Sequence, residues 1–230
     1  LYDNFSIDLI YGIPYSSMEK WKNNLKIALK YESPHLSCYS LTLEPNTALH
    51  YKVNSGDIKL LDEKLVKKQY NYLVEKLEEK GYRNYEFSSF AIPGHYAINN
   101  SNYWNGKPYI GIGPSAHSYN GKSIRSWNIS NNIKYVKAIM NNKLPLKKER
   151  LNKNDLYNEF IMSGLRKEEG VSLKKVRSLF GIRYKEYLKK QLNKHVSNNN
   201  IVFNGDLIKI SKKARFLTDG LSSDLFLVND

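Results

Sequence analysis

The stretch FSIDLIYGIPYSSMEKWKNNLKIALKYESPHLSCYSLTL, residues 5–43, decides the fold. Its first nine residues are mostly apolar, with β-branched and aromatic members, as in a strand buried on both faces of a parallel sheet. Ser16 and Glu19 have the spacing of a capping box, and apolar side chains then recur at helical intervals through residues 17–31. Residues 35–43 are a second strand-like run. This order predicts a βαβ unit with parallel strands.

The alternation of strand and helix patterns continues along the chain. We interpret residues 44–56 as a loop, Asp62 as the cap of a further helix, residues 82–91 as a third strand and residues 109–113 as a fourth. Such alternation indicates an α/β layer or a (β/α) barrel. In these folds the chemistry lies at the carboxyl ends of the strands.

The pattern changes after about residue 147. Three helical segments are followed by a hairpin signal around Asn204-Gly205 and by one more helical segment; they cover residues 152–166, 172–180, 184–195, 201–211 and 212–226. Three helices and a hairpin are typical of a winged helix. We therefore expect two domains, residues 1–147 and residues 148–230.

Composition limits the function classes. The formal net charge is +14, which fits nucleic acid, an anionic membrane surface or an acidic ligand such as a porphyrin carboxylate, and also fits an AT-rich genome rich in lysine codons. The single cysteine, Cys38, cannot by itself build a disulfide, a thiolate cluster or a zinc site, and it fits a reducing cytoplasm. The chain opens on Leu1-Tyr2 without Met, so we expect a fragment of a longer protein.

Several polar residues of the first half are candidates for ligand binding. Asp8 lies inside an apolar strand, where a buried carboxylate either binds a ligand's hydroxyl groups or is bonded to backbone. Glu44 and Glu86 either form an acid/base pair or serve as caps and salt bridges. Without a distance between the two carboxylates, the sequence leaves both alternatives open.

Aromatic and glycine-rich stretches follow the third predicted strand. Tyr103 and Trp104 stand beside an Asn105-Gly106 turn, either as one wall for a flat apolar ligand or as core residues. The stretch GIGPSAHS, residues 111–118, offers backbone N–H groups for an anion. Its His117 is either a metal ligand or a hydrogen-bonded structural residue.

Six stretches together resemble a known family, the radical SAM heme chaperones (HemW). They are SIDLIYGIP (6–14), HLSCYSLTLEPNT (35–47), YEFSSFAIPG (85–94), NNSNYW (99–104), GIGPSAHSY (111–119) and EFIMSGLR (159–166). They occur in the family's order, and the resemblance extends over essentially the whole chain. The resemblance implies the later strands of a partial (β/α) radical SAM barrel, followed by a winged-helix-like HemN C-terminal domain.

The resemblance also implies cofactors and partners. The family holds S-adenosylmethionine on a [4Fe-4S] cluster, binds heme and delivers it to membrane-bound respiratory cytochromes from the cytoplasm, with transient membrane association and a homodimer as further expectations. Asp8, Ile10 and Thr42 match positions that contact S-adenosylmethionine. Asn99, Asn100, Tyr103 and Trp104 match the family's heme motif, and His117 lies in the same heme region.

Two departures from the family shape the expected function. The cluster cysteines are absent from this chain, so we expect no catalytic residues, no metal ligands and no coproporphyrinogen oxidase activity from these residues alone. Asn99 stands where the family has His, and an amide does not replace an imidazole on iron. We expect a heme chaperone, ahead of an oxygen-independent coproporphyrinogen III oxidase and, last, a nucleic-acid-binding winged helix.

Overall fold

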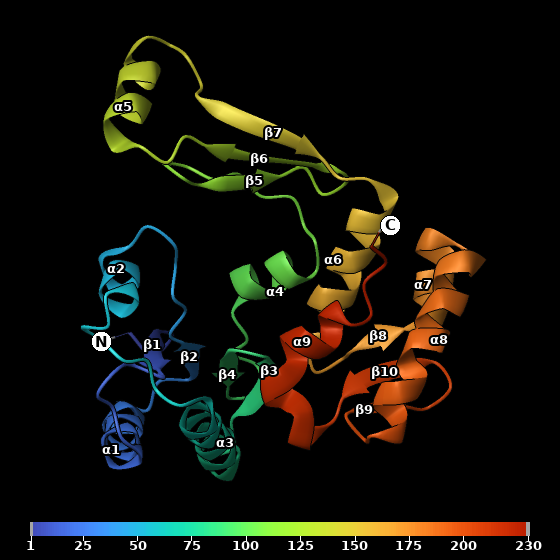
Figure 1. Ribbon diagram of the computed structural model, residues 1–230, viewed down its shortest axis with the longest axis horizontal. Helices are drawn as coiled ribbons and strands as arrows, with labels where there is room; N and C mark the ends of the chain where they lie inside the picture. Colours follow the sequence, from blue (N-terminus) through green and yellow to red (C-terminus); the bar gives the residue numbers. More distant parts are fainter. Residues whose placement is uncertain (1, 229–230) are drawn as a thin grey trace. The chain divides into compact units, whose positions relative to one another are not determined.

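The structure is a computed structural model that describes residues 2–228 (Figure 1). The chain forms two compact units, Leu1–Ala97 and Ile98–Asp230. The domain boundary expected at residue 147 stays a prediction; strand β7, Leu146–Arg150, runs across that position.

The first unit opens with the predicted βαβ unit. Strand β1 (Ser6–Tyr11), helix α1 (Met18–Leu29) and strand β2 (His35–Ser40) follow one another, and β1 pairs with β2 in parallel. The predicted capping box at Ser16 and Glu19 is wrong by one residue. The cap of α1 is Ser17, whose hydroxyl accepts a hydrogen bond from the Lys20 amide at 3.1 Å.

The next segment contains one predicted helix and one unpredicted helix. Asp62 caps helix α3 (Glu63–Glu79), as expected, and its carboxylate accepts the Lys64 N–H at 2.8 Å. The segment expected to be a loop contains helix α2 (Ala48–Asn54), which Thr47 caps through the His50 amide. A side-chain oxygen that accepts an N–H of the first turn offsets the missing backbone partners there.

The third predicted strand is a pair of strands. Strands β3 (Arg83–Glu86) and β4 (Ser89–Ala91) run antiparallel to each other, and the sheet order is β1-β2-β4-β3. The chain reverses at residues 87–88, where the Glu86 carboxylate accepts the Ser88 N–H at 3.1 Å. This sheet of four strands is open, so within the described residues the barrel is not closed.

The predicted fourth strand, residues 109–113, is also wrong, because only Tyr109 makes a bridge, to Tyr119. The second unit has instead an antiparallel sheet in the order β5-β6-β7, formed by β5 (His117–Tyr119), β6 (Ile124–Asn128) and β7. Helix α4 (Ile98–Trp104) precedes this sheet, and helix α5 (Asn132–Met140) connects β6 to β7.

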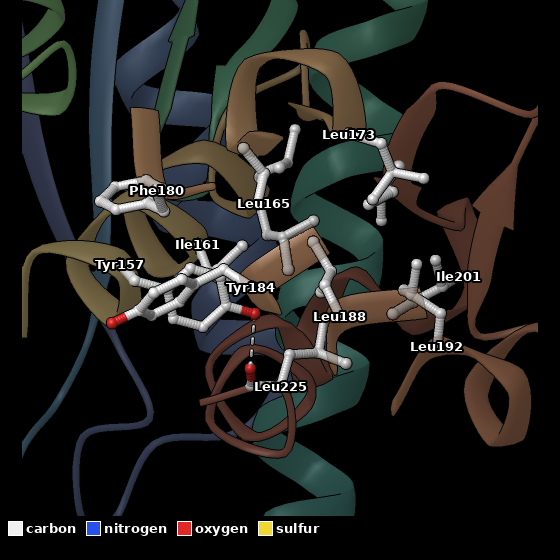
Figure 2. Close-up of a cluster of buried hydrophobic side chains, with 13 residues drawn as sticks. Tyr157, Ile161, Leu165, Leu173, Phe180, Tyr184, Leu188, Leu192, Ile201 and Leu225 are labelled. Atoms are coloured by element: carbon white, nitrogen blue, oxygen red, sulfur yellow. Dashed lines mark hydrogen bonds between the residues drawn. The ribbon is translucent and has the colours of Figure 1, made fainter. Parts of the chain in front are cut away.

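The carboxy-terminal segment has the predicted helices and hairpin. Its elements are α6 (Lys153–Leu165), β8 (Val171–Ser172), α7 (Leu173–Phe180), α8 (Ile182–Ser197), β9 (Ile201–Phe203), β10 (Leu207–Ile210), the 3₁₀ helix η1 (Lys212–Leu217) and α9 (Thr218–Ser223). Gly205 has φ +93° in the β9–β10 turn, which explains the Asn-Gly signal. Figure 2 shows the core that these elements share, in which the Tyr157 hydroxyl donates to the Leu225 carbonyl oxygen at 3.2 Å.

Gln69 holds the first unit together at the carboxyl end of β1. This buried side chain accepts the Gly12 N–H at 2.9 Å, and its backbone carbonyl accepts the Trp21 indole N–H at 3.0 Å. Gly12 has φ +76°, and a Cβ there would lie 3.3 Å from a methyl carbon of Val66. The strand end, α1 and α3 therefore meet at one buried amide.

We expect Gln69→Leu to lower the free energy of unfolding by about 1–3 kcal/mol, because the Gly12 N–H loses its buried acceptor. Urea denaturation checks this value. Lys68→Leu, on the exposed side of the same helix, is the control and should change stability by less than about 0.5 kcal/mol. Equal effects of the two substitutions would contradict the role of Gln69.

Candidate functional site

One face of the first sheet is open and carries the residues predicted to meet S-adenosylmethionine. Asp8 pairs with Ser37 and Ile10 pairs with Tyr39 across β1 and β2. Alternate residues of a strand share a face, so these four side chains lie on the same side of the sheet. Asp8, Ile10 and Tyr39 are exposed there. The expectation of a buried Asp8 carboxylate in a strand covered on both faces is therefore wrong.

A chain of hydrogen bonds runs along the same face, at a place where His35 and Tyr85 are buried. His35 Nδ1 lies 2.7 Å from the Ser6 hydroxyl, and His35 Nε2 lies 2.8 Å from the Tyr85 hydroxyl. Burial lowers the pKa of His35, while the nearby Asp8 carboxylate acts in the opposite direction. No sequence motif predicts this network, because its members come from three strands.

The remaining first-unit candidates lie apart from this network. Thr42 is exposed beyond the end of β2, and Glu44 is exposed in the loop that follows. Glu86 is buried and its carboxylate bonds a backbone amide, as expected for a turn rather than for acid/base chemistry. Cys38 is also buried, and burial raises the pKa of its thiol. The thiol is therefore protonated and enclosed.

In the second unit the Asn-rich stretch is helical, and the predicted Asn105-Gly106 turn follows it. Asn99, Asn100, Tyr103 and Trp104 all lie on α4, and the chain turns only at residues 105–106. Residues four apart share a helix face, so Asn99 lies next to Tyr103 and Asn100 lies next to Trp104. Asn99 is exposed, and 54% of the Tyr103 surface is exposed. Asn99 and Tyr103 therefore face solvent together.

Trp104 is held by residues that directly follow α6. The Arg166 guanidinium lies 5.0 Å from the centre of the Trp104 ring, and two hydrogen bonds of 2.7 and 2.5 Å fix it to the Asp219 carboxylate. The neighbouring Lys167 ammonium donates to the Asn105 side chain at 2.7 Å, and burial lowers the pKa of Lys167. The indole is thus fixed by a cation, whereas Tyr103 meets it edge-on at 5.1 Å.

Further aromatic rings extend from this pair to the sheet. Tyr109 lies 5.6 Å from Tyr103 and 6.3 Å from Tyr119, measured between ring centres. His117 is on the same face of β5 as Tyr119, is exposed, and stacks on Trp127 at 5.9 Å. The second unit therefore connects α4 to β5 through a series of tilted aromatic rings.

The glycine-rich loop does not form the predicted anion cradle. The Gly111 N–H donates to the Ser118 hydroxyl at 2.9 Å, and the Gly113 N–H donates to the Tyr135 hydroxyl at 3.3 Å. These amides are bonded within the protein. Asn128 also donates to the Gly113 carbonyl at 2.8 Å, so the loop is fixed on the sheet.

The part of the chain that the structure describes contains no group of three or more His, Cys, Asp or Glu side chains placed to hold a metal ion. A [4Fe-4S] cluster needs thiolate ligands, and the one cysteine here is enclosed and protonated. The residues of this chain therefore do not fit the cluster.

Across residues 2–228, every helix is too short or too polar to cross a bilayer.

Known proteins match this chain over most of its length. Residues 151–217 match the HemN C-terminal domain. The heme chaperone HemW of Lactococcus lactis subsp. lactis is 32% identical over 88% of this chain, and that of Buchnera aphidicola subsp. Schizaphis graminum is 32% identical over 95%. The chain is a homologue of the HemW heme chaperones. It spans about half of these relatives, 53% and 57% of their lengths.

A solved structure supports the fold of this HemW homologue. Coproporphyrinogen III oxidase (HemN) from Escherichia coli, described as a radical SAM enzyme, superposes with a TM-score of 0.77 over 97% of this chain and 55% of its own. The sequence identity is 17%, so this likeness concerns the fold alone. The resemblance inferred from the six motifs is confirmed at the level of the family and of the HemN C-terminal domain.

The His35 network predicts a pH dependence of stability. Because the folded state lowers the pKa of His35, the unfolded chain binds the proton more readily, and stability is lost as the pH falls below the ordinary histidine value of about 6.5. We expect His35→Gln to flatten the change in unfolding free energy between about pH 7.5 and 5.5. His95→Gln, at an exposed position of the same unit, is the control; an unchanged profile in His35→Gln would refute the assignment.

Proposed function

We propose that this chain is the heme-binding part of a HemW-type chaperone that delivers heme to respiratory cytochromes. The observation that carries the proposal is the exposure of Tyr103 beside a Trp104 that a cation fixes in place. A large aromatic side chain in water is costly unless it meets a partner. A flat apolar macrocycle is such a partner, and the named activity of the relatives agrees with it.

Asn99 and His117 are the two side chains to compare as ligands of the heme iron. Asn99 lies one helical turn before Tyr103, on the exposed face of α4, but an amide is a poor substitute for an imidazole. His117 is the exposed histidine of the same unit, and its strand belongs to the sheet that the α4 aromatic residues meet. We therefore propose stacking on Tyr103 and ligation by His117.

S-adenosylmethionine is proposed for the longer protein. Asp8 and Ile10 are exposed on one face of β1, where a ribose and an adenine ring find a carboxylate and an apolar side chain. Thr42, in the loop after the neighbouring strand, is proposed as the adenine contact. When bound, the [4Fe-4S] cluster would supply one-electron chemistry, and its thiolates would have to come from outside this chain.

The cellular setting follows from the same proposal. We place the protein in the cytoplasm, in transient contact with the membrane that holds the cytochromes. We also propose that it forms a homodimer. Nucleic acid is not part of the proposal. We also propose no coproporphyrinogen oxidase activity for the chain alone; conversion of coproporphyrinogen to protoporphyrinogen by the purified chain would contradict this.

Titration with heme tests the main proposal. The full chain should shift and sharpen the Soret band of added heme, and Tyr103→Ala should weaken binding about tenfold, because a stacked ring contributes about 1–1.5 kcal/mol. Tyr31→Ala, at an exposed tyrosine of the other unit, should bind as the unchanged chain does. A Soret band identical to that of free heme would refute heme binding.

Asn99→His tests where iron is held. An imidazole at this exposed helical position restores a ligand one turn from Tyr103, so we expect tighter binding and a changed ligand-field spectrum. His117→Ala should weaken binding in the unchanged chain and have a smaller effect in Asn99→His. If Asn99→His leaves both affinity and spectrum unchanged, iron is not close to α4.

A further inference from the structure

Helix α5 exposes an apolar face to solvent. None of its residues is buried, and the exposed fractions are 80% for Ile133, 54% for Val136 and 80% for Met140. Their spacing of three and four places them on one side of the helix. The opposite side contains Tyr135, whose hydroxyl accepts the Gly113 N–H from the loop before the sheet. The helix is therefore attached by one side and bare on the other.

The chain beyond α5 continues the same surface. The Lys143 N–H donates to the Ala138 carbonyl at 2.9 Å and closes the end of the helix. Leu144 follows and is exposed. With Ile139, five large apolar side chains in a stretch of twelve residues thus have little cover in this unit. Single exposed apolar residues are ordinary, but such a group marks an interaction site.

The charges around α5 have one sign. From Phe87 to Lys148 the sequence contains no Asp or Glu, whereas residues 1–86 hold 12 acidic and 12 basic residues. The acid-free stretch carries eight basic side chains: Lys107, Lys122, Arg125, Lys134, Lys137, Lys143, Lys147 and Lys148. Lys134, Lys137 and Lys143 are exposed on or directly after α5. The partner of this surface must therefore accept both apolar side chains and positive charge.

We propose that α5 lies flat in an anionic lipid surface, with Ile133, Val136 and Met140 in the acyl boundary and the lysines at the headgroups. A short amphipathic helix with basic residues beside its apolar face binds in this way. Nucleic acid would pair the lysines but would leave the apolar side chains against phosphates. The proposal uses different residues from those of the heme proposal, so either can fail alone.

Co-sedimentation with lipid vesicles tests the proposal on the full chain. Vesicles of phosphatidylcholine mixed with phosphatidylglycerol should bind the protein, and vesicles of phosphatidylcholine alone should bind it at least about tenfold more weakly, since each lysine near an anionic surface contributes about fivefold in affinity. Added salt should reduce the difference by screening. The variant Ile133→Ser/Met140→Ser should lose about tenfold in binding to the anionic vesicles.

Matched variants distinguish binding through α5 from non-specific binding of any exposed apolar or basic residue to vesicles. Ile182→Ser/Val202→Ser removes two other exposed apolar residues, 54% and 56% exposed and outside the acid-free stretch, and should bind as the unchanged chain does. Likewise Lys134→Gln/Lys137→Gln should weaken binding, whereas Lys189→Gln/Lys190→Gln should not. Circular dichroism confirms that each variant is folded.

Three outcomes would overturn the assignment: no vesicle binding, equal binding to neutral and anionic vesicles, or α5 variants that bind as the unchanged chain does. Absence of vesicle binding would leave a protein partner as the occupant of this face.

Discussion

The one-sided packing of the β1–β2 pair is the constraint on which the first unit depends. Helices α1 and α3 cover one face of these parallel strands, and Gln69 fixes the strand end to both helices through the Gly12 N–H and the Trp21 side chain. Because one face is closed by a tight core, the other is free to carry polar and exposed groups. That other face carries the exposed Asp8 and the His35 network, whose His35 and Tyr85 are buried.

In the second unit, too, one group is held in place by its neighbours while the group beside it is exposed to solvent. Arg166 donates hydrogen bonds to Asp219 and its guanidinium lies over the Trp104 ring, so the indole has a fixed position. Tyr103, the preceding residue on the helix, lies edge-on to this fixed ring and remains open to solvent. A binding wall needs both properties, because a side chain that must be ordered on binding loses part of the gain in affinity.

Local patterns explain which parts of the fold were predictable. The βαβ unit, the Asp62 cap and the Asn204-Gly205 hairpin each have signals within a few residues, and each was found. The β3–β4 pair was missed because its turn at residues 87–88 has no Gly, Pro or Asn, and a buried carboxylate takes their role. The β5–β7 sheet was missed because β7 reads LKKER, without apolar alternation. Site residues drawn from separate strands, such as Ser6, His35 and Tyr85, have no common motif in one sequence.

The acid-free stretch from Phe87 to Lys148 connects the two proposed surfaces of the second unit. It contains both the α4 aromatic pair and the exposed face of α5. Heme and an anionic bilayer have the same chemical character, since each has a large apolar body bordered by carboxylates or phosphates. A segment without carboxylates of its own adds no repulsion toward either one, and its lysines attract both. The missing acidic residues are thus a physical reason for one segment to meet a tetrapyrrole and a membrane, whereas the charge-balanced first unit has no such preference.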